Sequence, residues 1–173
     1  MTKENLTNLI LNDYDSFIEY YQNNENIEIS EADFSHANLE NADFTNIDFS
    51  GSTFQEANLT NIKFIDCDLT GVDFSRCNIT ECDFSGSLLN AAIFNYATVN
   101  YCNFSDADMA GANLSEADLT DSDLSTCENL ESCRFDESTV WPDEDKLPED
   151  FDSSYNYDLS SLREEDEEGQ EDY

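Results

Sequence analysis

The chain has 173 residues, with 41 Asp and Glu against six Lys and Arg, which gives a formal net charge of −35. A chain of this length predicts one domain, and it holds no run of roughly eighteen or more apolar residues that could span a membrane. Direct binding of DNA or RNA is opposed by this charge, because nucleic-acid-binding domains are basic.

The first residues carry apolar side chains at helical spacing, including Leu6, Ile10, Phe17 and Tyr21. This spacing predicts one or two short helices over residues 2–22, within an N-terminal cap of residues 1–26 that covers the open end of the structure behind it. The start lacks a basic segment followed by an apolar core, so no signal peptide is expected.

Phenylalanine then falls at every tenth residue from Phe34 to Phe104, a spacing that neither a helix nor a strand produces by itself. Midway between these positions stand only Ile, Leu, Val or Met, with Phe49 as the one exception. The underlying unit is therefore five residues long, and the chain is a repeat protein.

Each unit has a large apolar residue at its centre and a small or aliphatic residue two positions earlier. These two side chains favour burial. The other three are short and polar, and we expect them to face water. Examples are Ala32-Asp33-Phe34-Ser35-His36 and Ala117-Asp118-Leu119-Thr120-Asp121.

These units resemble the A-(D/N)-(L/F)-X-X motif of the pentapeptide-repeat family, over roughly residues 27–135. The resemblance implies an all-β solenoid, namely a right-handed quadrilateral β-helix with twenty residues per coil. The centres from Ile29 to Leu124 make about five coils, and we place the β-helix at residues 27–136.

A twenty-residue coil also sorts the centres into columns of distinct chemistry, which supports four sides independently of the family. Phe34, Phe54, Phe74 and Phe94 fall in one column, and the phenylalanines from 44 to 104 fall in the opposite one. Like residues would then stack in registered ladders. Gly51, Gly71 and Gly111, with Ala91 in the gap, share one corner where the turn can require a positive φ.

After Leu124 the frame slips by one residue, and prolines at 142 and 148 end the repeat pattern. We assign residues 137–152 to an irregular C-terminal cap, in which Trp141 and Phe151 cover the last coil. Residues 153–173 form an acidic tail that cannot bury enough apolar surface to fold.

Neither a catalytic nor a metal site is predicted, and no cofactor is expected. The one histidine, His36, occupies an outward corner without a nucleophile or base arranged around it. Four of the six cysteines, Cys67, Cys77, Cys82 and Cys102, fall on inward positions where a thiol packs as a small apolar group. Reduced thiols predict a cytoplasmic protein.

Much of the negative charge lies on the coils. Between Ile27 and Ser125, eighteen acidic residues stand against Lys63 and Arg76, so the net charge is −16. Five coils rising about 4.8 Å each make a rod of roughly 24 Å, and B-DNA of that length carries roughly 14 charges. The linear charge densities match.

Acidic residues also recur at the same outward position of successive coils. We predict that these ladders bind a DNA-binding protein in place of DNA, as a DNA mimic. An alternative stays open, because the motif itself favours Asp or Asn before the centre and an acidic surface also serves solubility. The predicted ladder residues are Glu28, Asp33, Asp43, Asp48, Asp68, Asp73, Asp83, Asp108, Asp118 and Asp123.

The resemblance implies a target as well. The quinolone-resistance members of the family bind DNA gyrase or topoisomerase IV in place of DNA, which makes gyrase the leading candidate. Looped members have insertions between coils, whereas residues 29–124 here have none. The family's dimer forms through an apolar C-terminal end, and the acidic C-terminus here leaves a homodimer open.

One stretch departs from the acidic pattern, because no charged residue occurs between Asp83 and Asp106. In register, Leu88 and Ile93 fall on outward positions and Tyr96 and Tyr101 on outward corners. We predict an apolar belt that contacts a partner or a second copy of the chain, as in an interaction scaffold. Alternatively, residues 155–157 fold back over the belt.

Overall fold

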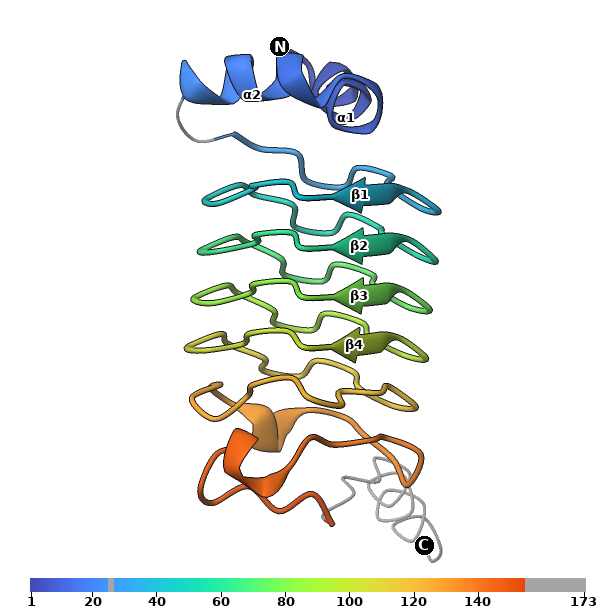
Figure 1. Ribbon diagram of the computed structural model, residues 1–173, viewed down its shortest axis with the longest axis vertical. Helices are drawn as coiled ribbons and strands as arrows, with labels where there is room; N and C mark the ends of the chain where they lie inside the picture. Colours follow the sequence, from blue (N-terminus) through green and yellow to red (C-terminus); the bar gives the residue numbers. More distant parts are fainter. Residues whose placement is uncertain (25–26, 155–173) are drawn as a thin grey trace, which may run out of the picture.

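The computed structural model of the chain describes residues 1–24 and 27–154. The chain winds into a stack of coils, with two helices over one end and an irregular segment over the other (Figure 1). Residues twenty apart pair in parallel from coil to coil, as Leu39 does with Leu59. The right-handed quadrilateral β-helix predicted from the repeat is confirmed.

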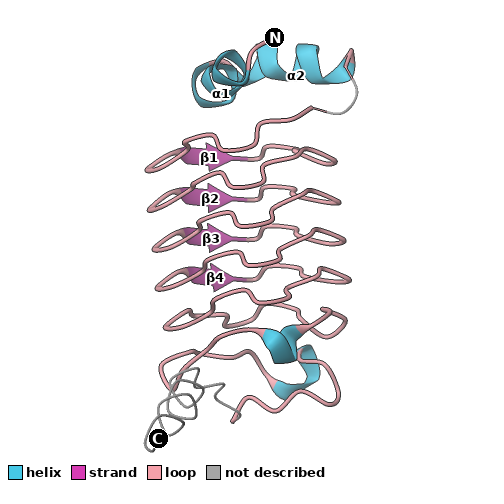
Figure 2. Ribbon diagram, turned by 180° about the vertical axis from the view of Figure 1, so that it is seen from behind, coloured by secondary structure: helices cyan, strands magenta, loops and turns pink. Residues whose placement is uncertain are grey.

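Regular strands form on one side of the solenoid only (Figure 2). The other sides are joined by single β-bridges such as Asp48 to Asp68, because each side turns a corner after a few residues. Backbone N–H groups still find partners one coil away, as Phe54 does on the carbonyl of Asp73 at 2.7 Å. The strands are β1 (Asn38–Glu40), β2 (Asn58–Thr60), β3 (Asn78–Thr80) and β4 (Thr98–Asn100).

The phenylalanine columns fill the core, and their rings stack along the solenoid axis as predicted. Phe34 and Phe54 lie 4.7 Å apart between ring centroids, and Phe84 and Phe104 lie 4.9 Å apart. Rings of the two opposite columns meet edge to face. Phe49, the exception to the alternation, is fully buried and meets the edges of four neighbouring rings.

The corners of the coils hold the backbone in the left-handed region. The predicted glycine corner is confirmed, with a positive φ at Gly51, Gly71, Gly111 and Ala91. Positive φ is much more widespread, however, and occurs at sixteen non-glycine residues of the described chain. At Gly86 an added Cβ would lie close to the carboxylate of Asp66, which is the end of an exposed side chain that can move aside, so packing does not require glycine there.

Two helices form the N-terminal cap, α1 (Lys3–Asn12) and α2 (Tyr14–Gln22). The side chains of Thr2 and Asp13 accept backbone N–H groups at the two helix starts, as N-caps do. Phe17 is fully buried and meets the ring of Phe44 edge to face at 6.0 Å. In the described residues, no helix has the length and apolar character needed to cross a membrane.

The C-terminal segment continues the coil pairing before it departs from the repeat. Val140 bridges to Asp118, and the N–H of Leu124 donates to the carbonyl of Lys146 at 2.8 Å. Trp141 packs against Phe151 at 4.9 Å and against Phe135 at 5.2 Å. This segment contains the 3₁₀ turns η1 (Leu130–Ser132) and η2 (Glu144–Lys146). The predicted tail, from residue 155 onward, lies outside the described residues.

All six cysteines are buried and free, as expected of apolar fillers. Several thiols also donate to carbonyl oxygens of the preceding coil, for example Cys67 to Phe44 at 3.0 Å. The side chains at inward positions therefore stabilise the stack both by packing and by satisfying backbone acceptors.

Candidate protein-binding surface

The ten predicted ladder acids lie on the outer surface, but most are not fully exposed. Glu28, Asp33 and Asp123 are exposed, and the other seven are half-buried between neighbouring coils. The expectation that all three polar positions of each unit face water was therefore wrong in part. Ser75 and Ser115, which follow their centres, are even buried.

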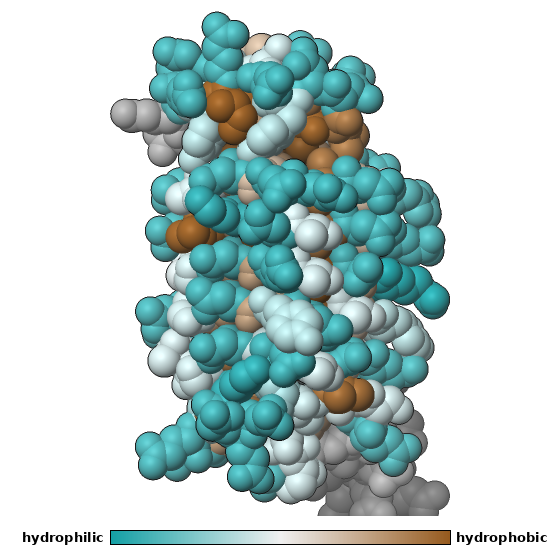
Figure 3. All heavy atoms as spheres, viewed as in Figure 1, coloured by the Kyte–Doolittle hydropathy of each residue, from teal (hydrophilic) through white to brown (hydrophobic). Residues whose placement is uncertain are grey.

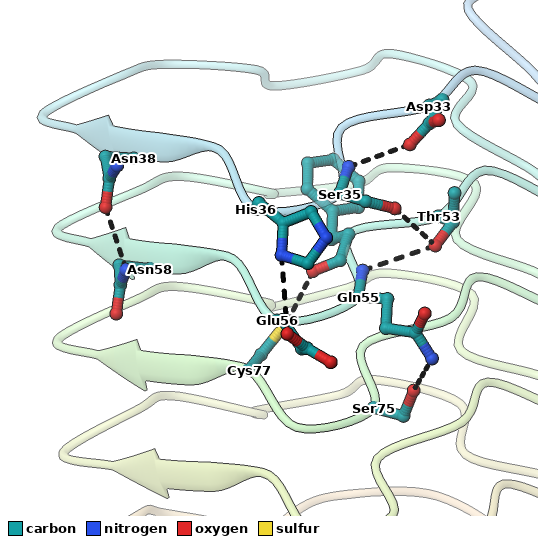
Figure 4. Close-up of polar contacts among 11 residues, drawn as sticks. Asp33, Ser35, His36, Asn38, Thr53, Gln55, Glu56, Asn58, Ser75 and Cys77 are labelled. Atoms are coloured by element: carbon teal, nitrogen blue, oxygen red, sulfur yellow. Dashed lines mark hydrogen bonds and ion pairs between the residues drawn. The ribbon is translucent and has the colours of Figure 1, made fainter.

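Nine of the ten acids have a local structural role. Each accepts the backbone N–H of the residue two positions later, at 2.8 to 3.2 Å, as Asp33 does with Ser35 (Figure 4). Such Asx-type bonds stabilise a turn. Glu28 instead accepts the hydroxyl of Ser30.

Hydrogen bonds favour the ionised carboxylate at three of these acids. The backbone N–H of Ser35 is the main cause that lowers the pKa of Asp33 below its ordinary value. The amide of Asn90 lowers the pKa of Asp108, and the hydroxyl of Ser125 lowers that of Asp123. The surface thus keeps these charges at any pH near neutrality.

The outward residues before each centre form four columns, and only one of them stacks acids in consecutive coils. The Asp48 column (28, 48, 68, 88, 108) begins with three acids in a row. In the Asp83 column (43, 63, 83, 103, 123), Lys63 pairs with Asp43 at 3.1 Å, and Asn103 donates to Asp83 at 3.0 Å. Acids alternate there with a cation and an amide.

The Asn58 column (38, 58, 78, 98, 118) is mostly uncharged. The amide of Asn58 donates to Asn38 at 2.8 Å, one coil away (Figure 4). The Asp73 column (33, 53, 73, 93, 113) mixes acids with Thr53, Ile93 and Asn113. The sequence therefore places amide and carboxylate side chains at equivalent positions of the same fold.

The structure reveals a second set of acids that the sequence reasoning left out. They stand at the coil corners, two residues after each centre, where the side chain extends into solvent. The twenty-residue period could have identified them, because every fifth residue is a corner. They are Glu31, Glu56, Asp66, Glu81, Asp106, Glu116 and, less exposed, Asp121.

Acidic side chains are distributed around the solenoid rather than gathered on one wall. Counted together with the corner that follows it, each of the four sides carries four or five of them between Ile27 and Ser125. The side seen in Figure 3 is accordingly hydrophilic over most of the coils, with small separate apolar patches. Both basic residues of the coils are engaged, since Lys63 pairs with Asp43 and Arg76 lies over the ring of Tyr96.

The belt residues are exposed, as predicted, with Leu88 at 46% and Tyr101 at 62% of full accessibility. They do not form one flat patch, because Leu88 and Ile93 lie in two different columns and the tyrosines at two further corners. Arg76 covers part of Tyr96, with its guanidinium carbon 4.9 Å from the ring centre. Residues 155–157, which the alternative prediction folds back over the belt, lie outside the described residues.

His36 is exposed and lies within 3.4 Å of the Glu56 carboxylate (Figure 4). In the chain as described, no three His, Cys, Asp or Glu side chains are placed to hold a metal ion. The charge and shape of the described surface suit binding to another macromolecule.

Family models match most of the repeat region. One, described as "Pentapeptide repeat region", matches residues 57–135, and another, "Pentapeptide repeats (8 copies)", matches residues 28–64. Together they cover more than half of the chain. No curated protein matches the sequence.

The chain is similar to the solved structure of Rfr23, a pentapeptide repeat protein from the cyanobacterium Cyanothece 51142. The TM-score is 0.63 at 22% identity, over 66% of this chain and 90% of that one. A thylakoid-lumen protein from Arabidopsis thaliana matches with a TM-score of 0.44 at 26% identity, over 52% and 66%. QnrB1, a plasmid-mediated fluoroquinolone resistance protein, matches with 0.44 at 24%, over 64% and 57%.

Proposed function

Since the chain belongs to the pentapeptide-repeat family, whose members generally serve as structural or protein-binding proteins rather than enzymes, we propose that it acts as a DNA mimic. It occupies the DNA-binding groove of another protein, with carboxylates in the places of phosphates. Binding inhibits or modulates that protein by competition with DNA. The proposal rests on one observation: many surface residues carry a negative charge, although the fold needs only their side-chain oxygens.

Turn stabilisation requires a side-chain oxygen, not a negative charge. Asn103 accepts the N–H of Ser105 at 3.0 Å, and Asn113 accepts that of Ser115 at 3.1 Å. These distances are nearly the same as the 3.0 Å between Asp83 and Ser85. Asparagine at every such position would preserve the bond, so the fold does not explain why so many of these residues are aspartate.

Stacked carboxylates also cost free energy. Asp48 and Asp68 occupy the same position of adjacent coils, about 4.8 Å apart along the axis. Two unit charges at that distance repel by about 0.9 kcal/mol in water before salt screening. The Asn58 column replaces this repulsion with a hydrogen bond between amides. Carboxylates that are retained despite this repulsion are consistent with selection for a function that needs their charge.

The arrangement of the charge fits a DNA-binding groove. Acids on all four sides of a narrow rod give a negative potential around its circumference, as on a duplex. A positive groove would attract the rod at long range and speed its capture. Such attraction weakens as salt screens it.

DNA gyrase is the leading candidate target, through the resemblance to the quinolone-resistance members of the family. The test is a competition assay, in which a fluorescent duplex bound to purified gyrase is displaced by increasing amounts of this protein. We expect displacement at low salt, and direct binding of the protein to gyrase that weakens steeply between about 50 and 200 mM salt. A duplex that stays bound at every concentration of the protein would refute gyrase as the target.

A second function, that of a protein-binding scaffold, is favoured by the exposed belt. Replacement of Leu88 by Asp and of Ile93 by Asn gives these positions residues that their own columns carry at 68 and 113. A scaffold that contacts its partner through the belt would lose that partner in the L88D/I93N variant, even at high salt. A mimic would keep its affinity for gyrase.

A further inference from the structure

Two corners of the solenoid each carry an exposed tyrosine in the same coil, but their surroundings differ. The Tyr96 corner (36, 56, 76, 96, 116) holds a cation of the chain itself, because Arg76 lies one coil before Tyr96 and over its ring. The Tyr101 corner (41, 61, 81, 101, 121) has Glu81 at the position equivalent to Arg76. The positions one coil before the two tyrosines are thus alike in backbone conformation and opposite in charge.

The positions of Arg76 and Glu81 are equivalent because their backbones pair with the next coil in the same way. The N–H of Arg76 donates to the carbonyl of Asn95 at 2.9 Å, and the N–H of Glu81 donates to that of Asn100 at 3.1 Å. Each therefore stands one coil before a tyrosine, and all four of these corner residues have a φ between 57° and 61°. A guanidinium stacked on Tyr101 as Arg76 stacks on Tyr96 would meet the carboxylate of Glu81.

In the described residues, no cation of the chain lies over the ring of Tyr101, unlike that of Tyr96. Tyr101 is 62% exposed, the most accessible of the large hydrophobic side chains in the coils. In residues 1–24 and 27–154, no cation pairs with Glu81, whereas Lys146 lies 3.4 Å from Asp121 on the other side of Tyr101. Glu81 is the acid left to receive an incoming cation.

The same coil leaves hydrogen-bond acceptors unused. The buried side-chain oxygens without a partner in the described residues belong to Asn95 and Asn100, which immediately precede the two tyrosines. Buried polar atoms in native structures are nearly always paired. In the described residues, this coil therefore combines two buried oxygens without a partner and two exposed aromatic rings.

We propose that Tyr101 and Glu81 form a binding site for an arginine side chain of the partner protein. The ring face binds the planar guanidinium by a cation–π contact, and the carboxylate of Glu81 accepts its N–H groups. Arginine suits this site better than lysine, because its flat, weakly hydrated cation stacks on aromatic rings. The proposal deepens the proposed function, on which it rests for the class of partner, since DNA-binding grooves present arginine.

The test titrates the folded protein with N-acetyl-arginine methylamide and, separately, with the lysine analogue, and follows the backbone amide resonances of residues 81, 100 and 102 by NMR at about 150 mM salt, because all variants retain them. We expect arginine to shift these resonances and to bind several-fold more tightly than lysine. Y101N should weaken arginine binding about two- to fivefold, the size of an exposed cation–π contact, while Y101F should retain it. Asparagine is the native residue at corners 41 and 61, with φ of 57° and 52°, so Y101N keeps the backbone.

A matched control separates the site from general negative charge. E81Q and D106N each remove one charge from an exposed corner with a φ of 57°, but Asp106 has Gly86 and Thr126 as its corner neighbours and no aromatic ring. Only E81Q should weaken arginine binding. Equal binding of arginine and lysine, equal effects of E81Q and D106N, or undiminished binding by Y101N would each overturn the proposal. No gyrase is used here, so this site and the proposed mimicry can fail independently.

Discussion

Asp73 and Asn113 lie in the same column, two coils apart, and their side-chain oxygens make the same bond. Asp73 accepts the N–H of Ser75 at 2.8 Å, and Asn113 accepts the N–H of Ser115 at 3.1 Å. One residue is charged and the other is neutral, so the pair separates the structural role of this position from its charge.

We therefore expect D73N to leave stability nearly unchanged and D73A to lower the free energy of unfolding by about 1 kcal/mol, the net contribution of one such hydrogen bond. Urea unfolding followed by circular dichroism measures both. If D73N were as destabilised as D73A, the charge rather than the accepted hydrogen bond would be what the turn requires.

Acid pH should remove part of this stabilisation. The pKa values of Asp33, Asp108 and Asp123 are lowered in the fold from an ordinary 3.8, mainly by the N–H of Ser35, the amide of Asn90 and the hydroxyl of Ser125 respectively. The unfolded chain then takes up protons before the fold does as pH falls. The contribution is complete above about pH 4 and is lost as pH falls through the lower folded-state pKa.

The measurement compares urea unfolding of the native chain with that of the D33N/D108N/D123N variant from pH 6 to pH 2. Asparagine does not titrate, so the variant lacks this particular loss. The difference in unfolding free energy between the two proteins should change below about pH 4. A difference that stays constant down to pH 2 would contradict the assigned hydrogen bonds.

The stacked phenylalanines should dominate stability. Phe74 is fully buried between Phe54 and Phe94, at centroid distances of 5.3 and 5.1 Å. F74A removes the ring from the middle of the column and should cost about 3 to 5 kcal/mol. F74L should cost less, because Leu114 closes the same column natively. Urea unfolding measures the stability of both variants. A loss of less than about 1 kcal/mol of unfolding free energy in F74A would contradict the stacked core.

The cysteines should be inert in the native protein. Burial raises the pKa of Cys67, Cys77, Cys127 and Cys133 to about 12, so few thiolates of these four exist at pH 8. The pKa of Cys82 is instead lowered, mainly by a side-chain hydrogen bond with Cys102, so burial alone protects this thiol. All six thiols are also shielded from solvent. We expect negligible reaction with Ellman's reagent at pH 8 in buffer and reaction of all six in urea. A native thiol that reacts within seconds would show that a coil opens readily.

The five-residue period, together with the twenty-residue coil that the family resemblance implies, predicts the core and the glycine corner, because packing forces like residues into register. It does not predict the role of the acid before each centre, such as Asp48, which appeared as a free surface charge. A signal was present, since Ser50 and equivalent short residues two positions later are typical of Asx turns. The corner conformation could not be predicted from residue type, because Glu81, Arg76 and Tyr96 rarely adopt a positive φ.

The belt shows a similar limit of sequence reasoning. Exposure of Leu88, Ile93, Tyr96 and Tyr101 followed from the period, but their separation onto different sides did not enter the prediction. The stacking of Arg76 on Tyr96 also joins residues twenty apart, which the period places together but cannot orient. Whether these two side chains stack depends on their directions, which only the folded structure defines.

The central claim is that the carboxylates of the solenoid serve binding beyond their role in the turns. The most direct measurement compares the affinity of the native protein and of the D48N/D68N variant for gyrase, at one low ionic strength. Each substitution keeps the turn acceptor and removes one charge from a single column. The account predicts an unchanged melting temperature and at least about tenfold weaker binding, or about 1.4 kcal/mol; equal affinity of the two folded proteins would contradict it.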